Sequence, residues 1–89
     1  MTAHQDLINA TASDLIARLR TEEITPLDLL DALEARIGAV DPAVNAMPTL
    51  CFERARDHAK ALMAKPVSER GLLAGMPVAI KDLEDVEGV

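Results

Sequence analysis

Aromatic residues are almost absent from this 89-residue sequence, which has Phe52 but neither tryptophan nor tyrosine. A core must therefore be built from alanine, leucine, isoleucine, valine and methionine. At this length such a core is thin, because domains this small bury only about 60–65% of the surface of the unfolded chain. With 49% hydrophobic and 27% charged residues, the composition is nevertheless that of a globular protein rather than a disordered one.

Cysteine is equally scarce: Cys51 is the sole cysteine, which excludes an internal disulfide and a cysteine metal cluster. We expect Cys51 to be a small apolar filler. The 9 basic residues are outnumbered by 15 acidic ones, and the net charge of −6 argues against nucleic acid as a partner. No apolar run approaches the roughly 20 residues of a membrane span. Residues 1–6 lack the basic and apolar regions of a secretory signal, so we expect a cytoplasmic protein with no membrane partner.

The beginning of the chain contains one clear helix-start signal. Thr11 is followed three residues later by Asp14, a spacing that resembles a capping box and predicts a helix beginning near Thr11 or Ser13. Residues 1 to about 10 precede this signal, and we expect them to be a loose lead-in.

A second helix has the best-marked start in the chain. Thr25 is suited to the N-cap, Pro26 to the first helical position, and Asp28 to the first turn. Gly38 is a plausible terminator, and Asp41-Pro42 is expected to stop the helix firmly.

The second half of the chain predicts strands as well as a helix. Residues 45–50 are expected to form a first strand, edge or irregular because Pro48 lies within it, and residues 78–80 a second. A helix from about residue 52 to 63 separates them, so the two strands can be parallel. Two strands alone make no stable parallel sheet. The expected fold class is therefore α/β, with N-terminal helices and the first strands of a mixed sheet flanked by helices, incomplete in this chain.

A lysine, Lys81, ends the second predicted strand, within residues 71–82 (GLLAGMPVAIKD). Strand ends at the edge of an open α/β sheet are where such sheets usually place their chemistry. A lysine that follows an apolar strand can be partly desolvated, which lowers the pKa of its amine and makes it a usable base. Lys81 is therefore the candidate catalytic residue, and the alternative is a surface lysine that closes a strand.

Residues 71–82 resemble the start of the signature segment of amidase signature hydrolases. That pattern runs roughly Gly-Pro-Leu-x-Gly-(Ile/Val)-Pro-(apolar)-(Ala/Gly)-(apolar)-Lys-Asp, and Asp85 and Gly88 continue it here. Leu72 replaces the frequent proline, and Ala74 the frequent histidine or small polar residue. The predicted helices also resemble the family's opening, so the resemblance covers nearly the whole chain.

The resemblance implies that residues 1–89 are the N-terminal part of a single amidase domain. Residues 1 to about 42 would be a helical lead-in, and about 43–89 the start of the α/β core. It also implies an enzyme that cleaves carboxamide C–N bonds through a Ser–Ser–Lys triad, with Lys81 as the lysine. The family's two serines lie in a Gly/Ser-rich loop well downstream, and Ser13 and Ser68 lack that context. We therefore expect the 89-residue chain alone to be inactive.

Other polar residues near Lys81 are expected to be structural. Asp82 is interpreted as an acceptor of backbone or lysine hydrogen bonds rather than a second catalytic group. Glu84, Asp85 and Glu87 are interpreted as a solvated acidic turn, because oxygen-ligand cages need more specific loop spacing. We expect no cofactor and no metal.

Two alternatives remain beside a general amidase. Within the family, the glutaminase subunit of a tRNA-dependent amidotransferase ranks below it. Outside the family, the chain would be a small non-catalytic helical module that binds a partner through Leu27, Leu30 and Ile37. The expected partners are a small-molecule amide substrate and either a second copy, giving a homodimer, or the rest of the amidase chain. Which amide is the substrate is left open.

Overall fold

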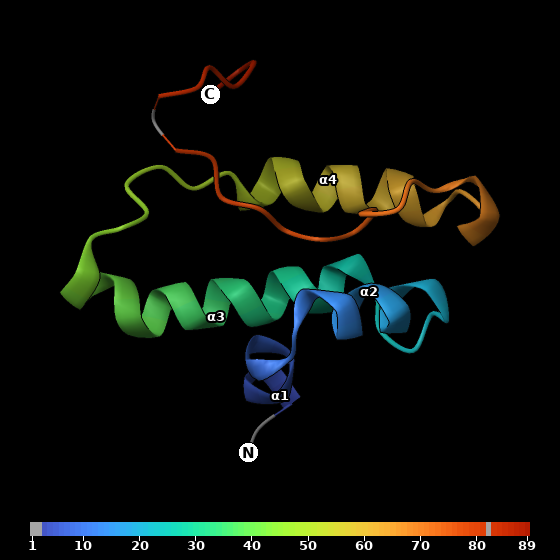
Figure 1. The fold of residues 1–89 in the computed structure, drawn as a ribbon. Helices are drawn as coiled ribbons and strands as arrows, with labels where there is room; N and C mark the ends of the chain where they lie inside the picture. The colour runs from blue at the N-terminus through green and yellow to red at the C-terminus, as the bar shows by residue number, and fades with distance from the viewer. Residues whose placement is uncertain (1–2, 82) are drawn as a thin grey trace.

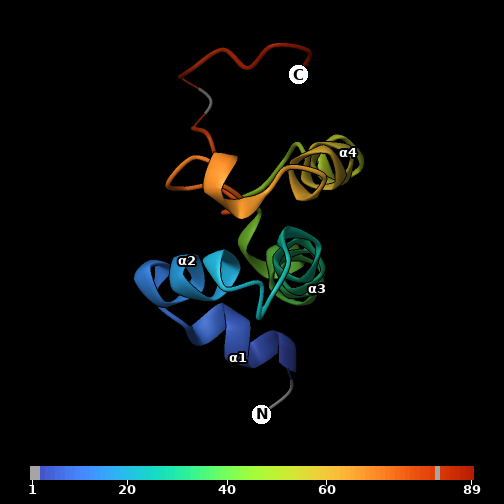
Figure 2. The same ribbon diagram turned by 90° about the vertical axis from the view of Figure 1, so that its right-hand side faces the viewer.

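A long central helix organises the fold, which is known from a computed structural model describing residues 3–81 and 83–89. In chain order the elements are α1 (Ala3–Asn9), α2 (Ala12–Arg20), α3 (Pro26–Val44), α4 (Phe52–Met63) and the 3₁₀ helix η1 (Val67–Glu69). Helix α4 lies alongside α3 and runs in the opposite direction, whereas α1 and α2 lie on other sides of α3 (Figures 1 and 2). The chain after η1 returns past the start of α3 and ends beyond α4 (Figure 1).

The predicted α/β class is wrong: residues 3–81 and 83–89 contain no β-strand. Residues 45–50 and 78–80, predicted as strands, are irregular, and α3 and α4 pack against each other rather than against a sheet. A strand needs hydrogen bonds to a neighbouring strand, and neither segment meets one in this part of the chain. Val78 and Ile80 are 76% and 56% exposed, so the apolar pattern that predicted a strand is left uncovered.

The prediction of a loose lead-in is also wrong, because residues 3–9 form α1. This helix packs on α3 and buries Leu7, which is 8% exposed. A seven-residue helix is unstable alone, so its stability comes from this packing rather than from local propensity.

The predicted starts of the next two helices are confirmed. The Thr11 side-chain oxygen accepts a hydrogen bond from the Asp14 N–H at 3.1 Å, and α2 follows. Thr25 and Asp28 form a reciprocal capping box. The Asp28 N–H donates to the Thr25 hydroxyl oxygen at 3.1 Å, and the Thr25 N–H donates to the Asp28 carboxylate at 2.8 Å. Each bond satisfies an N–H that the helix geometry leaves without an intrahelical partner.

The predicted end of α3 is too early, since the helix continues through Gly38 and Pro42 to Val44. Pro42 lies in the last turns, where its missing N–H removes one hydrogen bond without breaking the helix. Asn45 then ends it in the left-handed conformation (φ 56°, ψ 41°), and its N–H donates to the Asp41 carbonyl at 2.7 Å. The Asp41 carboxylate accepts two further backbone N–H groups just beyond the helix.

The core lies between α1, α2 and the first turns of α3, and its side chains are all aliphatic. It comprises Leu7, Leu15, Leu19, Ile24, Leu29 and Ala32, with Ala10 and Met76 packed against it. The range predicted for the third helix, residues 52–63, is that of α4, and its buried residue is Ala59. Cys51 precedes α4 and is exposed, so the prediction that it fills the interior is wrong.

Candidate functional site

The signature-like segment begins with a turn that is fixed to the core. The Ala74 N–H donates to the Gly71 carbonyl, and the Met76 N–H to the Leu73 carbonyl. Gly75 has φ +91°, and a β-carbon there would lie 3.0 Å from Pro26 Cγ and 3.3 Å from Leu19 Cδ2. A glycine is therefore required for both the backbone conformation and the close approach to α2 and α3.

Beyond this turn the segment leaves the core, and Lys81 is exposed. Its carbonyl accepts a hydrogen bond from the Glu84 N–H at 3.0 Å, which closes a turn immediately after it. Among the ion pairs and side-chain hydrogen bonds of the described residues, none involves the Lys81 ammonium group. The desolvation expected for this lysine is therefore not provided by residues 3–81 and 83–89.

The tail that follows Lys81 is tied to the start of α4. The Arg54 guanidinium donates from Nη1 to the carbonyl oxygen of Glu87, 33 residues along the chain. Gly88 has φ +81°, and a β-carbon there would lie 3.3 Å from the same nitrogen. The Val89 N–H donates to the Val86 carbonyl at 3.1 Å, closing a last turn around this contact.

The other residues considered from the sequence do not gather around Lys81. Ser13 lies in α2 and Ser68 in η1; both are exposed, and no hydrogen bond of the described residues joins either one to Lys81. Asp82 lies outside the described residues. Glu84, Asp85 and Glu87 are exposed, and no group of three or more potential metal ligands is found in the part of the chain that the structure describes.

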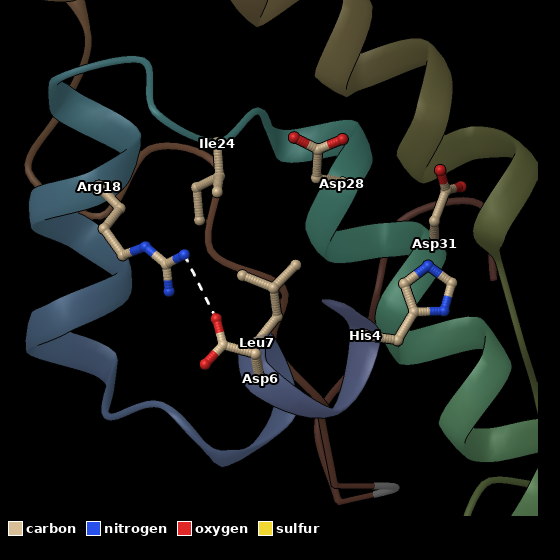
Figure 3. A pocket seen from close by; sticks show the side chains of 7 residues that line it. All are labelled: His4, Asp6, Leu7, Arg18, Ile24, Asp28 and Asp31. Atoms are coloured by element: carbon tan, nitrogen blue, oxygen red, sulfur yellow. Dashed lines mark ion pairs between the residues drawn. The ribbon is translucent and has the colours of Figure 1, made fainter. Parts of the chain in front are cut away.

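A hollow of about 330 Å³ on another side of the molecule was not predicted from the sequence. It is lined by His4, Asp6, Leu7, Arg18, Ile24, Asp28 and Asp31, which come from α1, α2, the turn after α2 and α3 (Figure 3). Within it the Arg18 guanidinium points toward the Asp6 carboxylate, 3.5 Å away (Figure 3). Its residues are far apart in sequence, so no local pattern could have indicated it.

The charged groups of this hollow are already engaged in holding the helices together. Arg18 pairs with Glu23 at 2.5 Å and with Asp6 and Asp14, and the hydrogen bond to Glu23 is the main cause that raises the pKa of Arg18 above its ordinary value. The Asp28 carboxylate caps α3. These pairings make the hollow part of the scaffold rather than a second candidate site.

A second arginine joins α3 to α4. Arg56 donates to Asp31 at 3.1 Å and to Glu34 at 2.9 Å, and its guanidinium lies 5.6 Å from the centre of the Phe52 ring. The hydrogen bonds to Glu34 and then Asp31 raise the pKa of Arg56. In the sequence these residues are simply polar helix positions, and only the packing of the helices selects the pairs.

Comparison with known families matches the amidase family model to residues 28–89, from the first turn of α3 to the end of the tail. The chain belongs to the amidase family. The matched range contains the Gly71–Gly75 turn, Lys81 and the tail, so the resemblance seen in the signature-like segment is confirmed. Helices α1 and α2 lie outside the match.

Three similar bacterial proteins are all the same subunit of a glutamyl-tRNA(Gln) amidotransferase. The one from Mesorhizobium japonicum is 44% identical over 85 residues, 94% of this chain. Those from Shouchella clausii and Roseiflexus sp. are 45% identical over 76 residues and 42% over 80, which are 85% and 89% of this chain. The chain spans only 16% of the length of each of these three relatives. No solved structure matches the chain.

Hydropathy gives one further finding about this amidase-family chain. Within the described residues, none of the helices combines the length and apolar character needed to cross a membrane.

Proposed function

We propose that this chain supplies the proton-accepting lysine, Lys81, of an enzyme that cleaves carboxamide C–N bonds. The observation that carries the proposal is the position of Lys81: it lies near the end of the signature-like residues 71–82, inside the range that matches the amidase family. The activity belongs to the complete enzyme, and we propose that the 89-residue chain alone is inactive. Ser13 and Ser68 do not supply the triad serines.

The proposed chemistry follows from what a serine nucleophile needs. A serine hydroxyl is weak unless a neighbouring base takes its proton. The resemblance implies that Lys81 deprotonates a bridging serine, which in turn deprotonates the nucleophilic serine as it attacks the amide carbon. The lysine then returns the proton to the leaving amine. A lysine amine is a base near neutral pH only where its surroundings lower its pKa, so the exposed Lys81 needs cover from the rest of an amidase.

The relatives reverse the order of the two options within the family. Because they are subunits of a glutamyl-tRNA(Gln) amidotransferase, they favour the glutaminase subunit over a general amidase. We therefore propose L-glutamine as the amide donor. Association with the rest of the amidase chain and a cytoplasmic location accompany this proposal.

The helical binding module is disfavoured by the packing of its supposed binding stripe. Leu30 is buried, and Leu27 and Ile37 are half-buried within the chain itself. The stripe is thus largely occupied by the chain's own side chains.

The test compares Lys81→Ala with Lys60→Ala in the complete enzyme chain that contains these residues. Lys60 is a matched control, because it is an exposed lysine on α4. Removing a general base should lower kcat/KM for L-glutamine by about 10²–10⁴-fold or more, whereas the control should behave as wild type. Equal kcat/KM values for Lys81→Ala and wild type would refute the proposed role.

A further inference from the structure

We infer that Arg54 is a positioning residue for Lys81, acting through the tail that it holds against α4. The inference rests on the proposed function, since it assigns a purpose to the contact only if Lys81 takes part in the reaction. Arg54 itself is at the other end of the tail from the lysine and does not touch the reacting atoms.

The first support is the contact itself, which joins two distant parts of the sequence. Arg54 Nη1 donates to the Glu87 carbonyl, a backbone atom, so the bond fixes the path of the chain rather than one side chain. Gly88 gives the guanidinium room, because its φ is +81° and a β-carbon there would approach Nη1 to 3.3 Å. The backbone of the tail is thus shaped to receive the arginine.

The second support is the place of Lys81 between two anchors. On one side Gly75 is pressed against Leu19 and Pro26. On the other, Arg54 holds Glu87, six residues after the lysine. Val78, Ile80 and Leu83, between the anchors, are exposed, so burial contributes little to fixing this stretch. The direction in which the chain carries Lys81 therefore depends on both ends being held.

The third support is that Arg54 is badly placed to stabilise its own helix. It lies in the first turn of α4, where the helix dipole favours acidic side chains such as the preceding Glu53 and disfavours cations. The hydrogen bond from Arg54 to the tail accounts for an arginine at this unfavourable position. Arg56, two residues later, has a different task, since it pairs with α3.

The experiment uses the complete enzyme with L-glutamine as the substrate and four variants: Arg54→Met, Arg54→Lys, Lys81→Ala and Arg36→Met. Arg36 is an exposed arginine on α3 and serves as the matched control. Displacing a catalytic group by about 1 Å can cost about 10²-fold in rate. We expect Arg54→Met to lower kcat by about 10- to 100-fold while KM stays near its wild-type value. The kcat of Arg54→Lys should lie between the values of wild type and Arg54→Met, since lysine retains a hydrogen-bond donor but lacks the planar guanidinium.

Hydrogen exchange supplies a readout that does not depend on turnover. Arg54→Met should speed exchange of the Glu84 and Val89 amides, which close the turns after Lys81, without changing exchange in α2 or α3. Arg36→Met should change neither measurement.

The outcomes separate this inference from the proposed function. If Arg54→Met lowers kcat and speeds exchange of the tail, the inference holds. If Lys81→Ala abolishes turnover and Arg54→Met retains the wild-type kcat, or lowers it without altering exchange of the tail, Arg54 does not position the lysine through the tail. If Lys81→Ala is as active as wild type, the proposed function fails first, and the inference falls with it.

Discussion

The two ends of this chain use similar apolar residues in opposite ways. Residues 7–32 hold the core, in which six aliphatic residues are each no more than 8% exposed. Residues 72–89 carry six of the exposed large hydrophobic side chains: Leu72, Leu73, Val78, Ile80, Leu83 and Val89. The first region buries most of its large apolar side chains within the chain, with Ile8 exposed, and the second leaves most of them exposed.

This difference teaches which part of the molecule is self-contained. Helices α2 and α3 have capped starts and share a core with α1. The residues that fix these three helices therefore lie within a short stretch of sequence. The contacts that hold the C-terminal region include Gly75 and Met76 on the core and Arg54 on the tail. Exposed apolar groups at this density are typical of a surface that contacts more protein, which agrees with a chain spanning 16% of its relatives.

The largest contrast should come from shortening one leucine in each region. Leu29 is 5% exposed and Leu73 is 65% exposed. Leu29→Ala should destabilise the chain by about 2–5 kcal/mol, because it removes buried methyl groups and leaves a cavity. Leu73→Ala should change stability by less than about 0.5 kcal/mol. Thermal and urea unfolding of the 89-residue chain, followed by far-ultraviolet circular dichroism, measures the stability of both variants. Similar losses of stability in the two variants would contradict the difference described between the regions.

A smaller contrast is expected within the turn that connects the regions. Gly75→Ala should cost about 1–2 kcal/mol or more, because a residue with a β-carbon resists positive φ and this β-carbon would press on Pro26. Gly71→Ala is the control, since a β-carbon at Gly71 meets nothing within 4 Å. The same unfolding experiments apply, and a Gly75→Ala variant as stable as Gly71→Ala would show that the turn is not docked as described.

The smallest effect concerns the cap of α3. Thr25→Ala should cost about 1 kcal/mol, since it removes the acceptor of the Asp28 N–H. Thr49→Ala, at an exposed threonine outside the helices, should be neutral. The melting temperatures of the two variants measure this difference. Equal melting temperatures for Thr25→Ala and Thr49→Ala would mean that the capping box contributes nothing to stability.

Local signals explain most of what the sequence could predict. The starts of α2 and α3 depend on residues three positions apart, and the range of α4 on helical periodicity, so each was predictable. Helix α1 was missed because it is short and because its packing on α3, which buries Leu7, is a tertiary contact that no local pattern shows. The strands were predicted from apolar residues alone, whereas a strand also needs a partner that residues 3–81 and 83–89 do not supply.

The candidate site was predictable in the same limited sense. The signature-like pattern indicated both Lys81 and the family. The match to the family model confirms the family. The pattern could not indicate Arg54, because its acceptor is a backbone carbonyl 33 residues away. The sequence also did not indicate that Arg18 and Arg56 would each form ion pairs with several carboxylates, because these pairs depend on how the helices pack.

The central claim is that Lys81 acts as a base and not merely as a positive charge, and Lys81→Arg tests it most directly. Arginine keeps the charge and much of the length but stays protonated near neutral pH. In the complete enzyme, kcat/KM for L-glutamine should therefore fall by at least about 10²–10⁴-fold, as for Lys81→Ala, with little change in melting temperature. A Lys81→Arg enzyme with near-wild-type kcat/KM would contradict the claim.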